Sequence, residues 1–412
     1  MKAFFERHTH TFEQKAGLVF ILILMINIAR PMLSIPHVNY TTYNTGTISF
    51  FSGINPYPIE WQNSGPYEHL SWFLYHPSFC IFFYIFSTAG LGMYAGTFFW
   101  LLINLLIFWF GFVGLLSLLG SETDILKGRW FLLVLFLMFN EVQAPLLNHH
   151  VNCFVSGTMM LGLVAYMKHN FARSAFLLAT AVTFKVLPIV LVLLLFLEFK
   201  WKFIFCFFGF LLMMLMIPLF FISLDFYFEI LSHWVAILLT EPLRTDYIGL
   251  QPTLAYFERG VDSGYFLVFM MINALAVAIA AFTVFSFSKK DFTRLIFPLA
   301  ILFLLIFNKR TETPTFVFMA PLYAFMLHAV LREKQNKNFT MMLIHVIALT
   351  VSWILATYMY TDLYPYDLRQ IARANHVKLF GLIVMYAWSW MQFFTFGKLG
   401  YSTNRSITPK IN

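Results

Sequence analysis

The sequence predicts an all-α polytopic membrane protein with about twelve transmembrane helices. The chain has 412 residues, of which 60% are hydrophobic and 11% are charged, and its mean hydropathy is +0.75. Such a composition excludes a disordered chain and an ordinary globular one. Apolar stretches of about twenty residues recur from Ala16 to Phe396, and each is long enough to cross a bilayer.

The lengths of the apolar stretches predict the individual spans. We expect them at 16–35, 93–119, 128–143, 149–167, 172–186, 187–199, 203–223, 265–287, 292–307, 314–331, 339–360 and 376–396. Lys185 and Pro188 interrupt the two short spans between Ala172 and Phe199. We expect a broken pair of half-helices there, which is tolerated where protein or a water-filled cavity satisfies the freed backbone.

The distribution of charge predicts the orientation of the chain. If the spans alternate, about two thirds of the 27 Lys and Arg residues fall in loops on one side. Cytoplasmic loops carry such an excess, so we expect both termini in the cytoplasm. The net charge of +8 then reflects membrane orientation, and we expect no nucleic-acid partner.

Two long outer loops are expected, at 36–92 and 223–265, within a single membrane domain covering 1–412. The apolar run Pro77–Ala89 is too short to span and predicts an interfacial or re-entrant helix. Phe226–Leu239 can also lie in the interface plane. Most of the 19 carboxylates fall on the outer side, so we expect the chemistry there.

The first outer loop is dense in Asn, Tyr, Trp and His. Aromatic rings beside amides and carboxylates suit the faces of sugars, and the same rings suit an interfacial belt, so both interpretations stay open. The phrase Gly53–Tyr57 is a turn by composition. The candidate substrate-binding residues in this loop are Asn39, Tyr43, Asn55, Tyr57, Glu60 and His76.

A second polar group falls at the junction of the third and fourth spans. It consists of Glu141, Gln143, Asn148, His149, His150 and Asn152. A metal site is the less favoured interpretation, because adjacent histidines seldom face one centre and no H-E-x-x-H spacing occurs. The three cysteines, Cys80, Cys153 and Cys206, form neither a zinc motif nor a disulfide framework.

The remaining candidates are charged residues between apolar stretches. Lys185 lies in an apolar segment, where a cation indicates function unless its side chain reaches the interface. The turn Asn308–Thr315 places Lys309 and Arg310 beside Glu312. Two cations next to a carboxylate can hold a phosphate and a base side by side, although a solvated hairpin would also explain them. Gln251, in the second outer loop, is a weaker candidate.

Six short phrases carry a family resemblance through their order along the chain. They are Asn39-Tyr40-Thr41-Thr42-Tyr43, Gly53 to Tyr57, Tyr75-His76-Pro77, His150-Val151-Asn152, Lys185 to Pro188, and Glu312-Thr313-Pro314-Thr315. Each phrase is degenerate, and their shared order is the more specific feature. In this order the chain resembles glycosyltransferase family 87 and its bacterial relatives, within the GT-C class of multi-spanning glycosyltransferases.

The resemblance implies a GT-C-like fold and an enzyme that moves a hexose or pentose, with mannose favoured. The donor would be a polyprenyl-phosphate-linked sugar and the acceptor a lipid or glycan, on the outer face of a bacterial inner membrane. It implies an inverting displacement in which a carboxylate takes the acceptor's proton and cations neutralise the leaving phosphate. Membrane lipids are the other partners, and neither a metal nor another cofactor is expected.

The catalytic base departs from the family pattern. Many members of the class carry a catalytic Asp where this chain has Asn39, whose amide is not basic at neutral pH. Glu312 is therefore the favoured replacement and Glu141 the second, followed by Glu60 and Glu68.

Other functions remain open. A transporter or flippase would also have about twelve spans, but symmetric halves and charges near the midplane would be expected of it. We see no internal repeat, and most polar residues fall at the outer ends of the spans. A polymerase or ligase that uses polyprenyl diphosphate would share the face and the lipid, although a long loop late in the chain would be expected of it. A non-catalytic relative of the glycosyltransferases is a third alternative, because Asn39 stands where many members of the class carry the catalytic Asp.

Overall fold

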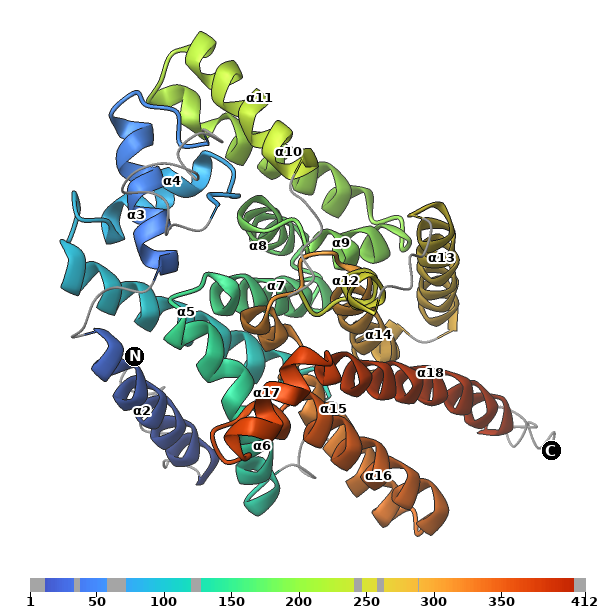
Figure 1. Ribbon diagram of the computed structural model, residues 1–412. Coiled ribbons are helices and arrows are strands. Elements are labelled where there is room, and N and C mark those ends of the chain that lie inside the picture. The colour runs from blue at the N-terminus through green and yellow to red at the C-terminus, as the bar shows by residue number, and fades with distance from the viewer. Residues whose placement is uncertain are drawn as a thin grey trace, which may run out of the picture. The chain divides into compact units, whose positions relative to one another are not determined.

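The structure, a computed structural model, describes residues 12–32, 38–57, 72–119, 127–240, 247–257, 263–287 and 289–403 (Figure 1). Every regular element within these ranges is a helix, which confirms the predicted fold class. The chain divides into two compact units. The first unit comprises Met1–Val192, Phe199–Leu243 and Thr313–Pro321, and the second comprises Leu193–Glu198, Arg244–Glu312 and Leu322–Asn412. The prediction of a single domain over the whole chain stays a prediction.

The described ranges contain eight helical segments long and apolar enough to cross a membrane. They are α2 (Phe12–Met32), α5 (Met93–Ser117), α6 (Arg129–Leu147), α10 with η5 (Trp201–Met216, Ile217–Phe220), α13 (Ser263–Phe287), η7 with α15 (Thr313–Phe318, Leu322–Gln335), α16 with η8 (Phe339–Ala356, Tyr358–Tyr360) and α18 (Val377–Thr403). Three shorter apolar helices are α7 (Asn152–Met167), α8 (Phe171–Phe184) and α14 (Phe292–Phe307). Together with α9 (Ile189–Phe196), they place a helix in every predicted span, so the polytopic membrane fold is confirmed.

The predicted break lies between α8 and α9. Helix α8 ends at Phe184, and Lys185 is extended, with φ −153° and ψ 125°. Pro188 explains the break, because proline lacks an N–H and disfavours helical geometry in the residue before it. Helix α9 has only eight residues and is therefore about 12 Å long, too short to cross a bilayer.

Helix α7 is the buried centre of the first unit and packs against α5 and α8, while α8 packs against α10 (Figure 1). The contact with α5 depends on glycine at two facing positions. A Cβ added at Gly111 would lie 2.5 Å from the carbonyl oxygen of Gly157, and one added at Gly157 would lie 2.4 Å from that of Ile107. Small residues permit such a close approach of two membrane helices.

The loop predicted to be the first outer loop contains a helix that was not expected from the sequence, α3 (Val38–Phe51). Its phenolic Tyr40 donates a hydrogen bond of 2.7 Å to the carbonyl oxygen of Phe86, at the end of η3 (Tyr84–Phe86). The short apolar run forms α4 (Ser78–Phe83), which is too short to span, as predicted. In the second long loop, Leu224–Thr240 forms helix α11.

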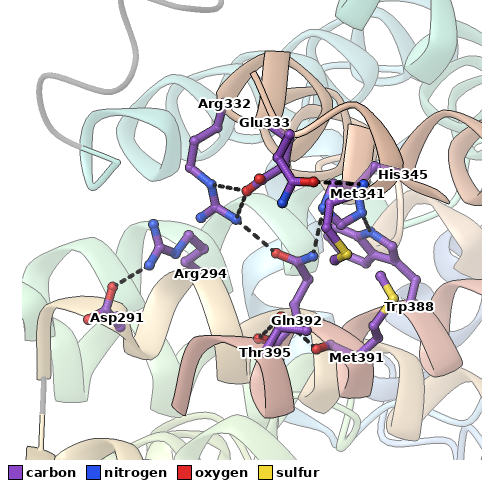
Figure 2. Close-up of polar contacts among 11 residues, drawn as sticks. Asp291, Arg294, Arg332, Glu333, Met341, His345, Trp388, Met391, Gln392 and Thr395 are labelled. Carbon is purple, nitrogen blue, oxygen red and sulfur yellow. Dashed lines mark hydrogen bonds and ion pairs between the residues drawn. The ribbon is translucent and has the colours of Figure 1, made fainter. Parts of the chain in front are cut away.

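In the second unit, α14 packs against α13 and α18, and α16 packs against α15 and α18. Figure 2 shows a polar cluster that joins α15, α16 and α18. Arg332 pairs with Glu333 at 3.1 Å and donates to Oε1 of Gln392 at 3.4 Å. The indole of Trp388 donates to Nδ1 of His345 at 3.2 Å. Because these groups are mostly buried and bonded to one another, we assign the cluster to packing of the three helices.

Two further short helices belong to this unit, α12 (Leu250–Tyr256) and α17 (Tyr366–Ala374).

Candidate functional site

A line of hydrogen bonds joins three separate segments of the first unit. Nζ of Lys185, at the break after α8, donates to Oδ1 of Asn152 at 2.9 Å. Nδ2 of Asn152, the first residue of α7, donates to Oγ1 of Thr315 in η7 at 3.3 Å. Asn152 and Thr315 are fully buried, whereas Lys185 is partly exposed. The line therefore includes a cation that is partly exposed.

The two predicted histidines follow the end of α6 and are buried. His149 has a φ of 52°, in the left-handed region, and the N–H of His150 donates to the carbonyl oxygen of Pro145 at 2.7 Å. Such a left-handed residue is a common way to end a helix and satisfy its last carbonyls. The indole of Trp100 donates to the carbonyl oxygen of His149 at 3.0 Å, which fixes this turn against α5.

Asn39 and Tyr43 of α3 lie against the same turn. Nδ2 of Asn39 donates to the carbonyl oxygen of Asn148 at 2.9 Å. The ring of Tyr43 meets that of His150 edge to face, with centroids 6.5 Å apart. The structure thus brings Asn39, Tyr43, His149 and His150 together around one turn.

Tyr75 links two predicted residues of the first loop, Tyr43 and Tyr57. Its hydroxyl lies 3.0 Å from that of Tyr43, and its carbonyl oxygen accepts a hydrogen bond of 2.6 Å from the hydroxyl of Tyr57. Burial raises the pKa of Tyr57 well above its ordinary value. Burial also lowers the pKa of His76, which precedes α4, to about 3. Both side chains are therefore neutral at physiological pH.

Glu141 is fully buried in α6, and α6 packs against η7, which carries Thr315. The amide of Asn140 donates to Oε1 of Glu141 at 3.5 Å. Helix α6 continues past its predicted end at residue 143 to Leu147, so Glu141 lies farther from the end of the helix than expected. Pro145 follows one turn later and has no N–H to bond the carbonyl oxygen of Glu141.

An open groove of about 550 Å³ lies between the end of α3 and the start of α11. Its volume is within the range of small-molecule sites. Aromatic rings and hydroxyl groups both contribute to the lining, which suits an amphipathic ligand. The lining residues are Phe50, Phe51, Ser52, Gly53, Phe221, Ile222, Ser223 and Phe226.

The second unit contains the other predicted cations. The N–H of Ile248 donates to the carbonyl oxygen of Thr311 at 2.7 Å, so the segment that leads to Gln251 lies against the Asn308–Thr311 turn. A Cβ at Gly249 would lie only 2.4 Å from the carbonyl oxygen of Asn308, and glycine permits this approach. Within one unit, the segment bearing Gln251 thus meets the turn bearing Lys309 and Arg310.

Charge and burial oppose each other at Arg310. Burial lowers the pKa of its guanidinium, and the negative charge of Glu312 acts in the opposite direction. Both side chains are half-buried. Glu312 is the last residue of its segment of the second unit, and Thr313 begins η7 of the first.

Some predicted residues are not placed, and some contacts were not anticipated. Glu60 and Glu68 lie outside the described residues. In the ranges that are described, no group of three or more His, Cys, Asp and Glu side chains could hold a metal ion. Tyr75 was named only as part of a motif, and Trp100 was not singled out, because a lone aromatic residue in an aromatic-rich chain carries no distinctive signal.

The comparison with known proteins identifies the family. The model of glycosyltransferase family 87 matches residues 73–308, which is more than half of the chain and includes both Asn152 and Lys185. Among curated proteins, no match was found. The family match confirms the resemblance that the ordered motifs indicate. Together with the helices long enough to span a bilayer, it shows that the chain belongs to glycosyltransferase family 87 and is a membrane glycosyltransferase.

Proposed function

We propose that this membrane glycosyltransferase takes its sugar from a polyprenyl-phosphate donor and transfers it to a lipid or glycan acceptor on the outer face of a bacterial inner membrane. Mannose is the favoured sugar among hexoses and pentoses. Both termini are proposed to be cytoplasmic, since the cations predominate in the loops of that side.

The observation that carries this proposal is the pairing of Lys185 with Asn152. A cation near the apolar part of a membrane protein is costly and is usually kept for function. The Lys185 ammonium is held by a buried amide yet remains partly exposed, so it can also approach an anion. The phosphate of a lipid-linked sugar is an anion that reaches the protein from the membrane.

The groove beside α3 supports a lipid-linked donor. Its lining combines phenylalanine rings with the side chains of Ser52 and Ser223. The lining also includes Gly53, which lies two residues before Asn55, a predicted substrate-binding residue. An apolar chain with a polar headgroup matches both parts of this lining. A nucleotide sugar would instead favour a glycine-rich phosphate loop, and we find none in the sequence.

The proposed reaction is a single displacement. The acceptor hydroxyl oxygen attacks the anomeric carbon, the bond from that carbon to the phosphate oxygen breaks, and the phosphate leaves as an anion. A carboxylate takes the proton of the attacking hydroxyl, which contributes about 10²- to 10⁴-fold in rate. A lysine or arginine neutralises the charge that develops on the phosphate.

Each role has more than one candidate. Glu312 remains the first candidate base, because it is half-exposed and an acceptor hydroxyl can reach it, and Glu141 is the second. Lys185, Lys309 and Arg310 are the candidate cations. In the first unit, the candidates for contact with the sugar hydroxyls are Asn39, Tyr43, Asn55, Tyr57, His76, His149, His150 and Asn152, of which Asn39 and Asn55 are partly exposed. Gln251, in the second unit, is a separate candidate.

The test is a transfer assay with the purified protein and labelled polyprenyl-phosphate sugars, each combined with candidate lipid acceptors. We expect a labelled lipid product in detergent, where no membrane barrier exists. Movement of labelled lipid across sealed vesicles without any new product would instead support a transporter. Binding of donor without product or transport would support a non-catalytic relative.

A further inference from the structure

Helix α11 contacts the first outer loop at two places in the first unit. Nδ2 of Asn55 donates to Oε1 of Glu229 at 3.4 Å and also contacts Nδ1 of His233. The indole of Trp234 donates to the carbonyl oxygen of Leu74 at 3.0 Å. No motif in the sequence singles out these residues of α11.

The contacts of Asn55 fix the orientation of its amide. The N–H of Tyr57 donates to Oδ1 of Asn55 at 3.0 Å, so Nδ2 is the atom that faces α11. Because Nδ2 can only donate, Nδ1 of His233 must accept, and the ring proton lies on Nε2. Glu229 and His233 are four residues apart and so share one face of α11.

The contacts of Asn55 with described residues use both amide hydrogens and one of the two lone pairs of Oδ1. Glu229 and His233 take the two hydrogens, and Tyr57 takes the lone pair. Among the described residues no donor meets the second lone pair, and Asn55 is partly exposed. Its amide is therefore arranged to accept a hydrogen bond from a ligand hydroxyl.

The surroundings indicate which ligand this is. Gly53, two residues earlier, lines the groove that we assign to the lipid-linked donor, and the groove continues to Phe226 at the start of α11. A hydroxyl that meets Asn55 then belongs to the headgroup of a ligand whose apolar part lies in the groove. The sugar of the donor fits this description.

We propose that Glu229 and His233 are positioning residues that orient Asn55 to accept a hydrogen bond from a hydroxyl of the donor sugar. The inference rests on the proposed function and adds to it two residues and the recognition step that they serve. Both side chains are exposed, so their contacts with Asn55 contribute little to folding.

The test compares three substitutions of His233. Asn keeps an acceptor oxygen near the position of Nδ1, Gln places its oxygen farther out, and Leu removes the acceptor. We expect His233→Leu and His233→Gln to raise the KM for donor by about three- to tenfold, the value of one hydrogen bond. His233→Asn should restore donor KM to within about twofold of the parent protein, and kcat and the acceptor KM should change little in all three.

A double variant and a control separate positioning from packing. Adding His233→Leu to Asn55→Leu should raise donor KM no further, because the effect of His233 passes through Asn55. Asp225→Asn, about two turns before His233 on the same helix and also exposed, should leave donor KM unchanged. Thermal unfolding of each variant should match that of the parent protein within about 2 °C, since surface substitutions change stability little.

The outcomes distinguish this inference from the proposed function. If the parent protein transfers sugar from the donor and His233→Leu has a normal donor KM, the positioning role is wrong and the function stands. Equal losses in the Asn and Leu variants would also contradict it, because the acceptor atom would then not matter. If the parent protein neither binds nor uses any polyprenyl-phosphate sugar, the proposed function fails and the inference fails with it.

Discussion

The ammonium group of Lys185 lies 2.9 Å from Oδ1 of Asn152, a side chain that is fully buried at the start of α7. The two residues are 33 positions apart, and the chain between them contains the rest of α7 and all of α8. The contact depends on the break after Phe184, because an extended Lys185 leaves the helical path. If the Lys185 side chain only extended to the membrane surface, we would not expect it to donate a hydrogen bond to a buried amide.

Replacing Lys185 should weaken donor binding more than folding. Lys185→Met keeps most of the apolar length and removes the charge, so we expect donor affinity to fall about tenfold or more, the value of a charge-assisted hydrogen bond. Binding of a labelled polyprenyl-phosphate sugar measures the effect. Lys168→Met, at an exposed lysine after α7, is the matched control. Normal donor binding by Lys185→Met would show that this lysine does not contact the phosphate.

Removing the base should abolish turnover and leave donor binding nearly intact. We expect Glu312→Gln to lower kcat by about 10²-fold or more, because Gln cannot accept the proton. Glu141→Gln is the paired variant, and loss in that variant with full activity in Glu312→Gln would transfer the role to Glu141. Full activity in both would leave the reaction without either proposed base and contradict the mechanism.

The close approach of α5 and α7 predicts a stability difference between two glycine substitutions. Gly157→Ala should destabilise the protein by about 1–3 kcal/mol, because its Cβ would lie 2.4 Å from a backbone oxygen that cannot move alone. Gly209→Ala, in α10, should be neutral or slightly stabilising, since its Cβ meets no atom within 4 Å. Thermal unfolding in detergent compares the two, and equal midpoints would contradict the packing of α5 on α7.

The burial of His76, outside the spanning helices, predicts a contribution to acid sensitivity. Its pKa is about 3 in the folded protein, and an unfolded histidine has a pKa of about 6.5. The unfolded state therefore binds the proton first, and stability falls as the pH decreases from about 6.5 toward 3. His76→Asn should reduce the drop in unfolding midpoint between pH 7.5 and 5, whereas His169→Asn, at an exposed histidine, should not. An unchanged drop in His76→Asn would show that His76 is not buried as a neutral group.

Much of the fold could be predicted because membrane helices depend on local properties of the sequence. An apolar stretch of about twenty residues specifies a span without reference to the rest of the chain. Pro188 likewise specifies a local break. Helix α3 could not be predicted in this way, because Val38–Phe51 is rich in Thr and Tyr and has no long apolar run. It is instead stabilised by burial of Tyr40, Tyr43 and Phe50 against other segments.

The site could be predicted only in part. The sequence singles out polar residues as candidates, since polar groups stand out between apolar helices. It could not identify their partners, because Asn55 with His233, or Ile248 with Thr311, are distant in sequence and share no periodicity. Gly249 is a partial exception, because glycine before a helix can mark a close backbone approach.

The most direct test of the proposed function is the anomeric configuration of the product. Purified protein would be incubated with a polyprenyl-phosphate sugar of known configuration and an acceptor, and the new linkage would be determined by NMR. A single displacement predicts a product of opposite configuration, formed with the lipid-linked donor and not with a soluble nucleotide sugar. A product that retains the donor's configuration, or one formed only from a nucleotide sugar, would contradict the account.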